Sequence, residues 1–336
     1  MKILVVGCGS IGHRHAANTG NFAAVGVVDK DELLALQIVK ATGAKHFKNL
    51  DDGLAWKPQG VVVATPPNTH LSIARAAIES GADVLIEKPI SNSQEGVDEF
   101  LLRARSLGRK VHVVCNMRFH PGPASLKRLL PEIGKPLFAR AYYGNYLPDM
   151  RPGVDYRKLY AAKKETGGGV ILDAIHEIDY LCWLFGMAHR VSCDSAKLSD
   201  LEIDVEDYAA IQLQMNNGVR CEIHLDYLQR FKRRGCEIIG SKGTLIWQSE
   251  GKSPENCQIR LFRIDTGKWH LVKEINEVDT NRPYSDLMKC FIEVLKGRDC
   301  PLLDGKTAAE ELSIALVAGR SATKKTSINL RESNGV

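Results

Sequence analysis

The sequence predicts an α/β protein whose first domain is a doubly wound parallel sheet and whose second is an α/β domain with a large, mainly antiparallel, open-faced sheet. An apolar strand at residues 2–7 runs into a glycine-rich turn. Strands then alternate with helices to about residue 115, a rhythm typical of parallel sheets. Between about 188 and 275 strand patterns follow one another directly, which favours antiparallel hairpins. We expect domain 1 at residues 1–118 and domain 2 at 119–336.

Composition narrows the class of protein. The chain has 336 residues, 44% of them hydrophobic and 25% charged, as in soluble chains of two domains. Its apolar runs are too short for a membrane span, and the N-terminal run is interpreted as a strand rather than a signal peptide. A net charge of +5 is too weak to indicate nucleic acid. Nine scattered cysteines without a CxxC pair predict neither a disulfide framework nor a zinc ribbon, and suit a cytoplasmic protein.

The glycine-rich turn has the spacing of a dinucleotide-binding loop. It reads Gly7-Cys8-Gly9-Ser10-Ile11-Gly12, directly after a strand and before a helix that extends to about Asn18. Gly7 permits the tight turn, Gly9 lets a pyrophosphate approach, and Gly12 lets the helix pack on the strand. Amides at the start of the helix, including those of Ser10 and Ile11, would face the phosphates. The first domain is therefore expected to be a Rossmann fold.

The end of the second strand bears on the choice of cofactor. Asp29 follows strand 24–28 and lies 17 residues after Gly12. A carboxylate at this position accepts hydrogen bonds from ribose hydroxyls and repels a 2′-phosphate, which favours NAD. Lys30 could pair with that phosphate, so NADP remains possible.

Two loops are expected at the carboxyl edge of the sheet. Thr65-Pro66-Pro67-Asn68-Thr69-His70 follows strand 60–64, and Glu87-Lys88-Pro89 follows strand 83–86. Ligands of open α/β sheets bind at this edge, so Thr65, Pro66, His70, Glu87 and Lys88 are predicted to line the nicotinamide end of the crevice. Pro89 restricts the backbone of Lys88. His13 and His15 are interpreted as cofactor-proximal or surface residues.

A second cluster of polar residues lies in a predicted helix at 170–185, after Gly167-Gly168-Gly169. Asp173 and His176 are three residues apart and would share a helical face. His176 could be catalytic, or a core histidine that pairs with Asp173 or Asp179. No metal site is predicted, because the chain lacks an H-E-x-x-H motif and a third clustered ligand.

Taken together, these motifs resemble the Gfo/Idh/MocA oxidoreductases along nearly the whole chain. The resemblance rests on the segments 7–15, 64–70, 87–89, 118–121, 167–179 and 239–245 and on the last helix. It implies a sugar, amino sugar, inositol or nucleotide-sugar substrate, oxidised or reduced at a secondary alcohol or ketone carbon with NAD(P). It also implies that the open-faced sheet builds a homodimer or homotetramer.

The resemblance also implies roles for individual residues. Lys88 would contact nicotinamide ribose and donate to the substrate oxygen, His176 would be the general base, and Asp173 would hold the imidazole or a sugar hydroxyl. Arg118, Tyr156 and Arg157 are further candidates for substrate binding.

The spacing between the aspartate and the histidine departs from the commoner family pattern, which has four residues where this chain has three. One residue rotates a helical side chain by about 100°, so Asp173 and His176 cannot both take the usual places on an unchanged helix. This Asp-x-x-His form resembles a branch that acts on nucleotide-linked or amino sugars, which makes these the preferred substrates.

Two other functions are compatible with the same motifs. The first is an NAD-dependent glycosidase, in which the hydride returns to the sugar and the net reaction is hydrolysis. The second is a non-catalytic sugar or nucleotide sensor. The presence of Lys88, Asp173 and His176 together argues against the sensor, because a protein that only binds does not need all three.

Overall fold

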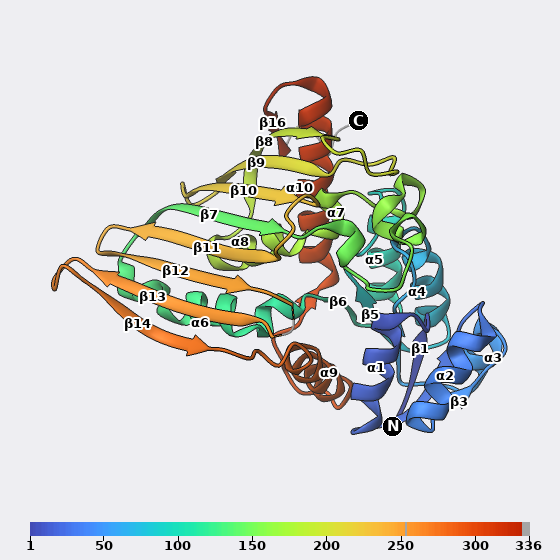
Figure 1. The fold of residues 1–336 in the computed structure, drawn as a ribbon. Coiled ribbons are helices and arrows are strands. Elements are labelled where there is room, and N and C mark those ends of the chain that lie inside the picture. The colour runs from blue at the N-terminus through green and yellow to red at the C-terminus, as the bar shows by residue number, and fades with distance from the viewer. Residues whose placement is uncertain (253, 331–336) are drawn as a thin grey trace. The chain divides into compact units, whose positions relative to one another are not determined.

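The structure, a computed structural model, describes residues 1–252 and 254–330, which fall into two compact units (Figure 1). The first unit contains Met1–Asn116 and Asn281–Ala309. The second contains Met117–Thr280 and the chain from Glu310 onward. The first unit thus includes a late segment that the sequence-based division assigned to the second domain.

The first unit is built on a seven-stranded sheet in the order β15-β6-β5-β4-β1-β2-β3 (Figure 1). Its strands are parallel except β15, which is antiparallel to β6, so the predicted doubly wound sheet is confirmed. The strands on both sides of β1 are almost completely buried, which is consistent with their continuous apolar sequences, because both faces of a parallel sheet are covered. The strands are β1 Lys2–Val6, β2 Ala24–Val28, β3 Lys45–His46, β4 Gly60–Val63, β5 Asp83–Glu87, β6 Val111–Val114 and β15 Leu303–Asp304.

Helix α9 explains why the late segment belongs to this unit. The helices here are α1 Ser10–Gly20, α2 Glu32–Thr42, α3 Leu50–Ala55, α4 His70–Glu79, α5 Val97–Ser106 and α9 Arg282–Leu295, with the 3-10 turn η1 Pro67–Thr69. Helix α9 packs against α1. The side chains of Asn18 and Asn281 exchange hydrogen bonds of 3.2 and 3.0 Å, and the Arg14 guanidinium lies 4.6 Å from the centre of the Tyr284 ring.

A disulfide joins Cys290 in α9 to Cys300, with 5.4 Å between their Cα atoms. The sequence analysis did not expect any paired cysteine, because the two residues lie in no recognisable motif. They meet because the chain reverses after α9 and returns to the sheet edge as β15. The other seven cysteines are buried and carry free thiols.

The second unit contains a nine-stranded sheet in the order β14-β13-β12-β11-β7-β10-β9-β8-β16 (Figure 1). Among the described strand pairs, β7 and β10 are the one parallel pair, so the expected mainly antiparallel sheet is confirmed. Gly218, with φ +89°, lies in the turn between β9 and β10. The strands are β7 Pro136–Gly144, β8 Ala188–Ala196, β9 Tyr208–Met215, β10 Arg220–Asp226, β11 Arg233–Gly240, β12 Gly243–Glu250, β13 Asn256–Arg263, β14 Lys268–Ile275 and β16 Ile328–Asn329.

Helices cover one face of this sheet. Helix α6 packs on β12 and β13, and α8 packs on β7 and β10. The helices are α6 Pro121–Leu129, α7 Val170–Asp173, α8 His176–Phe185 and α10 Gly305–Lys324. Residues 145–166 contain the 3-10 turns η4 Leu147–Asp149, η5 Tyr156–Lys158, η6 Tyr160–Ala162 and η7 Lys164–Thr166. Two other 3-10 turns, η2 Asn116–Phe119 and η3 Leu130–Ile133, flank α6.

The predicted single helix over 170–185 is wrong in one respect. Ala174 and Ile175 interrupt it, so Asp173 ends α7 and His176 begins α8. Ala174 has φ −96° and ψ 29°, outside the helical region, which turns the chain before α8 starts. None of the helices in the described parts of the chain is long and apolar enough to cross a membrane.

Candidate active site

The glycine turn after β1 has the geometry that a bound pyrophosphate requires. Gly7 has φ +96°, and a side chain on it would lie 2.5 Å from the Ala64 carbonyl oxygen. A Cβ on Gly12 would overlap the carbonyl oxygen of Gly7. Gly9 is exposed, and a Cβ there would meet no atom within 4 Å. Gly7 and Gly12 therefore fix the turn, whereas Gly9 leaves open space through which phosphates can approach the amides of Ser10 and Ile11 in the first turn of α1.

Asp29 lies at the end of β2 and is oriented by backbone N–H groups. One carboxylate oxygen accepts from the Cys8 amide at 2.5 Å, and the other accepts from the Asp31 amide at 2.8 Å. Each oxygen retains a further lone pair, so the carboxylate can also accept from ribose hydroxyls. Lys30 is exposed. The donors and acceptors around this turn fit NAD.

The two predicted loops do lie at one edge of the sheet. Val6 of β1 pairs with Val63 of β4, and Val63 pairs with Ile86 of β5. The chain therefore leaves all three strands at the same edge, toward Gly7, toward Thr65 and toward Lys88. Within the Thr65 loop, Thr69 donates a hydrogen bond to the Thr65 hydroxyl at 2.8 Å, and Pro66 is exposed.

Glu87 is held by a buried histidine. Its Oε1 lies 2.7 Å from Nε2 of His15, and its Oε2 accepts from the Lys88 amide at 3.1 Å. His15 comes from α1 and is completely buried. His15 is therefore not the surface residue that one of the two expectations allowed, and the sequence carries no local signal for a contact with Glu87, 72 residues away.

His70 bridges the two edge loops. Its side chain is completely buried, with Nδ1 2.9 Å from the Pro89 carbonyl oxygen and Nε2 2.8 Å from the Thr65 carbonyl oxygen. Burial lowers the pKa of His70, although both hydrogen bonds favour its charged form. Both ring nitrogens thus face backbone carbonyl oxygens, one in each of the two loops.

The three glycines before α7 allow close packing within the protein. A Cβ on Gly168 would lie 2.5 Å from the carbonyl oxygen of Tyr160, and Gly169 has φ +101°. Glu206 lies against Gly169 and caps the helix: its carboxylate accepts from the Ile171 amide at 3.1 Å. Burial raises the pKa of Glu206. These glycines therefore let other parts of the protein's own chain come close to the start of α7.

Asp173 is bound by two tyrosine hydroxyls. Tyr160 donates to Oδ1, and Tyr227 donates to Oδ2 at 3.2 Å. Tyr227 is completely buried, and burial raises its pKa well above the usual range, with the Asp173 charge adding to the effect. Neither tyrosine was predicted, because no motif connects it to Asp173.

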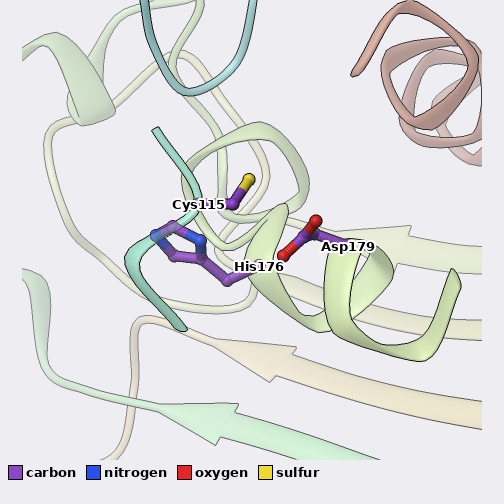
Figure 2. Close-up of side chains that lie close together, drawn as sticks. All are labelled: Cys115, His176 and Asp179. Carbon is purple, nitrogen blue, oxygen red and sulfur yellow. The ribbon is translucent and has the colours of Figure 1, made fainter. Parts of the chain in front are cut away.

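His176 is buried in the first turn of α8, and Figure 2 shows it with Asp179 on that helix. Cys115, also labelled in Figure 2, follows β6 and belongs to the first unit. Because the helix is interrupted after Asp173, the three-residue spacing does not place Asp173 and His176 on one continuous helical face. The shortened spacing between Asp173 and His176 thus coincides with a break in the helix between these two residues.

The two other acidic residues of α8 form buried ion pairs. Glu177 lies 2.7 Å from the Arg234 guanidinium, whose Cζ is 4.4 Å from the centre of the Tyr143 ring. Asp179 lies 2.6 Å from Arg118, which also contacts Glu311 at 3.1 Å. These ion pairs favour structural roles for both carboxylates and for Arg118.

Tyr156 and Arg157 lie together on the surface of the second unit. Arg157 is paired with Asp155 at 2.9 Å and with Glu202 at 2.7 Å. The Tyr156 hydroxyl accepts from the Glu202 amide at 3.1 Å. Arg157 borders an open hollow of about 430 Å³ whose lining includes Lys163 and Lys197.

Comparison with known proteins identifies both parts of the chain. Residues 1–115 match the oxidoreductase family with an NAD-binding Rossmann fold, and residues 125–246 match the GFO/IDH/MocA C-terminal domain. Glucose-6-phosphate 3-dehydrogenase of Bacillus subtilis is 30% identical, over 84% of this chain and 81% of its own length. Myo-inositol 2-dehydrogenase of Thermotoga maritima is 26% identical over 99% of both chains.

A solved structure supports the same assignment of fold. The WlbA dehydrogenase from Bordetella pertussis, in complex with NADH and UDP-GlcNAcA, aligns with a TM-score of 0.81 at 23% identity, over 98% of each chain. The predicted family, the predicted NAD cofactor and the expectation of an enzyme are confirmed. The chain belongs to the Gfo/Idh/MocA family of NAD-binding oxidoreductases.

Proposed function

We propose that the protein transfers a hydride between nicotinamide and a secondary alcohol or ketone carbon of a nucleotide-linked or amino sugar. Relatives named for glucose 6-phosphate and myo-inositol support a cyclic polyol or sugar as substrate. The WlbA complex with UDP-GlcNAcA supports a nucleotide sugar, as does the Asp-x-x-His spacing of residues 173–176. When bound, NAD supplies the hydride acceptor or donor.

Lys88 is proposed as the residue that acts on the substrate oxygen. The single observation that carries this role is its position directly after β5, at the edge where the glycine turn and the Thr65 loop also end. An ammonium donor stabilises the negative charge that develops on a sugar oxygen as its proton leaves. Thr65, Pro66 and Glu87 are proposed to line the nicotinamide end of the same edge.

His176 is proposed as the general base, with Asp173 as its partner or as a ligand of a sugar hydroxyl. A histidine suits proton transfer near neutral pH. Glu177 and Asp179 are in buried ion pairs with arginines, which makes them weaker candidates for the same role. If His176→Ala stays active and Asp179→Ala does not, the base has been misassigned.

Tyr156 and Arg157 remain proposals for binding the polar part of the substrate. The position of Arg157 beside a hollow with two lysines supports this, and the Tyr156 hydroxyl accepts from the amide of Glu202, which also lines the hollow. Arg118 is the weakest of the substrate-binding candidates, because two carboxylates already engage its guanidinium.

A homo-oligomer through the second sheet is also proposed. The edge strand β14 is exposed along most of its length and includes Trp269, 47% exposed, and Leu271, 56% exposed. Exposed apolar side chains on a sheet are typical of a surface that another subunit covers. Light-scattering mass at micromolar protein would test this: a clean monomer would refute it.

The substrate proposal is tested by identifying the cofactor that co-purifies and then screening sugars and nucleotide sugars. Mass spectrometry should find NAD or NADH in the purified protein. A nucleotide-linked or amino sugar should produce NADH absorbance in proportion to product. If the substrate is cleaved without accumulation of NADH, the NAD-dependent glycosidase replaces the proposed dehydrogenase.

A further inference from the structure

The segment that carries Lys88 is held on both sides by buried histidines from two different helices. On one side Glu87 contacts His15 of α1 at 2.7 Å. On the other side the Pro89 carbonyl oxygen contacts His70, the first residue of α4, at 2.9 Å. Lys88 itself is half-buried between the two. Both histidines are completely buried.

The two contacts differ in chemistry. Nε2 of His15 faces a carboxylate oxygen and donates to it, while its Nδ1 has no partner among the described residues. Both partners of His70 are backbone carbonyl oxygens, which only accept, so the neutral ring donates to one of them and the protonated ring donates to both.

We propose that His15 and His70 are positioning residues that fix the direction of Lys88. His15 does so by orienting Glu87, and His70 by tying the Pro89 carbonyl to the Thr65 loop. This inference rests on the proposed catalytic role of Lys88. A rigid support matters because a misplacement of about 1 Å can cost about a hundredfold in rate. His70 couples the lysine to the loop proposed to line the nicotinamide.

Substitutions of His70 allow its contacts with the two loops to be tested separately. An asparagine amide reaches about as far as Nδ1 and can still donate to the Pro89 carbonyl. A glutamine amide reaches about as far as Nε2 and can still donate to the Thr65 carbonyl. His70→Asn should therefore keep kcat within about fivefold and weaken NAD binding, whereas His70→Gln should keep NAD binding and lower kcat about tenfold to a hundredfold.

His15 offers a second, independent pair of variants. His15→Gln keeps a donor toward Glu87, whereas His15→Leu fills the space without one. We expect His15→Gln to retain most of the wild-type kcat and His15→Leu to lose about tenfold or more. His46→Gln, a change in β3 at the far edge of the same sheet, is the control and should behave as wild type.

Hydrogen–deuterium exchange separates this inference from the proposed function. In His70→Gln and His15→Leu, the peptide covering residues 83–92 should exchange faster than in wild type. If Lys88 is not catalytic but the inference is right, Lys88→Ala remains active, and peptide 83–92 still exchanges faster in His70→Gln and His15→Leu than in wild type. The inference is overturned if exchange and kcat stay at wild-type values in both variants, or if His70→Asn and His70→Gln lose kcat and NAD binding alike. If both His70 variants unfold, Glu87→Ala provides the alternative test, because Glu87 is only half-buried. Peptide 83–92 should then exchange faster in Glu87→Ala than in wild type. Unchanged exchange in this variant would overturn the inference.

Discussion

The edge of β5 in the first unit and the α7–α8 interruption in the second unit position their polar residues in different ways. At the β5 edge, Lys88 lies between Glu87, whose carboxylate contacts His15, and Pro89, whose carbonyl oxygen contacts His70. At the interruption, Asp173 and His176 lie beside buried carboxylates that arginines neutralise. The comparison teaches that contacts with two buried histidines support the first site, whereas ion pairs between buried carboxylates and arginines support the second.

The largest expected effect concerns the buried charges of the second unit. Arg234→Met leaves the buried Glu177 carboxylate without its arginine, which should cost about 3–5 kcal/mol of unfolding free energy. Chemical denaturation measures it. The neighbouring Arg233→Met is the control, because the Arg233–Glu250 pair is exposed and its loss should change little. If both variants lost the same unfolding free energy, the buried pair would contribute no more to stability than the exposed pair.

The disulfide in the first unit should have the next largest effect. The bridge between Cys290 and Cys300 closes a loop with a sequence separation of 10, so replacing both cysteines by serine should cost about 3 kcal/mol. Thermal unfolding of the double variant, compared with wild type with and without reductant, measures this. Reductant should destabilise the wild type and leave the double variant unchanged; a wild type insensitive to reductant would contradict the bridge.

Acid should destabilise both units through buried histidines. Burial lowers the pKa of His70 and His112 in the first unit and of His120 in the second below 6.5. The unfolded chain therefore takes up protons before the folded chain does as pH falls below 6.5. The stabilisation is complete above that pH and is lost as pH falls through the lowered values. Denaturation at pH 7.5 and 5.5 should show a lower unfolding free energy at pH 5.5, and an equal or higher one would refute this.

The smallest expected effect is at Asp173. Tyr227→Phe removes one of two hydroxyl donors to this carboxylate and should cost about 1 kcal/mol of stability, because one buried hydrogen bond is lost. It should also lower kcat if Asp173 assists His176. Tyr160→Phe removes the other donor, from a side chain that is only half-buried. If Tyr227→Phe lost much more stability than Arg234→Met, the proposed order of the two effects would be wrong.

Much of the fold follows from the sequence, and the reasons are local. The glycine turn, Asp29 and the two edge loops act through backbone conformation and strand order, which their own residues determine. The contact of His15 with Glu87 spans 72 residues and leaves no pattern in either segment. The interruption at Ala174 was missed because the apolar spacing of 170–185 continues across it, while Glu206 and Tyr227, which support the arrangement, come from later strands and loops.

The return of residues 281–309 to the first unit could not be predicted either. Helix α9 has the apolar stripe of any packed helix, and nothing in it specifies α1 as its partner. The hydrogen bonds between Asn18 and Asn281 that connect them join residues 263 positions apart.

The most direct test of the account is the rate of hydride transfer in Lys88→Ala with NAD bound at saturation. The account predicts that single-turnover formation of NADH from the identified sugar falls by about a hundredfold or more, because the donor to the developing oxyanion is gone. NAD affinity, measured by calorimetry on the same variant, should stay within about fivefold, since the glycine turn and Asp29 are untouched. A near-normal rate of hydride transfer in this variant would contradict the account.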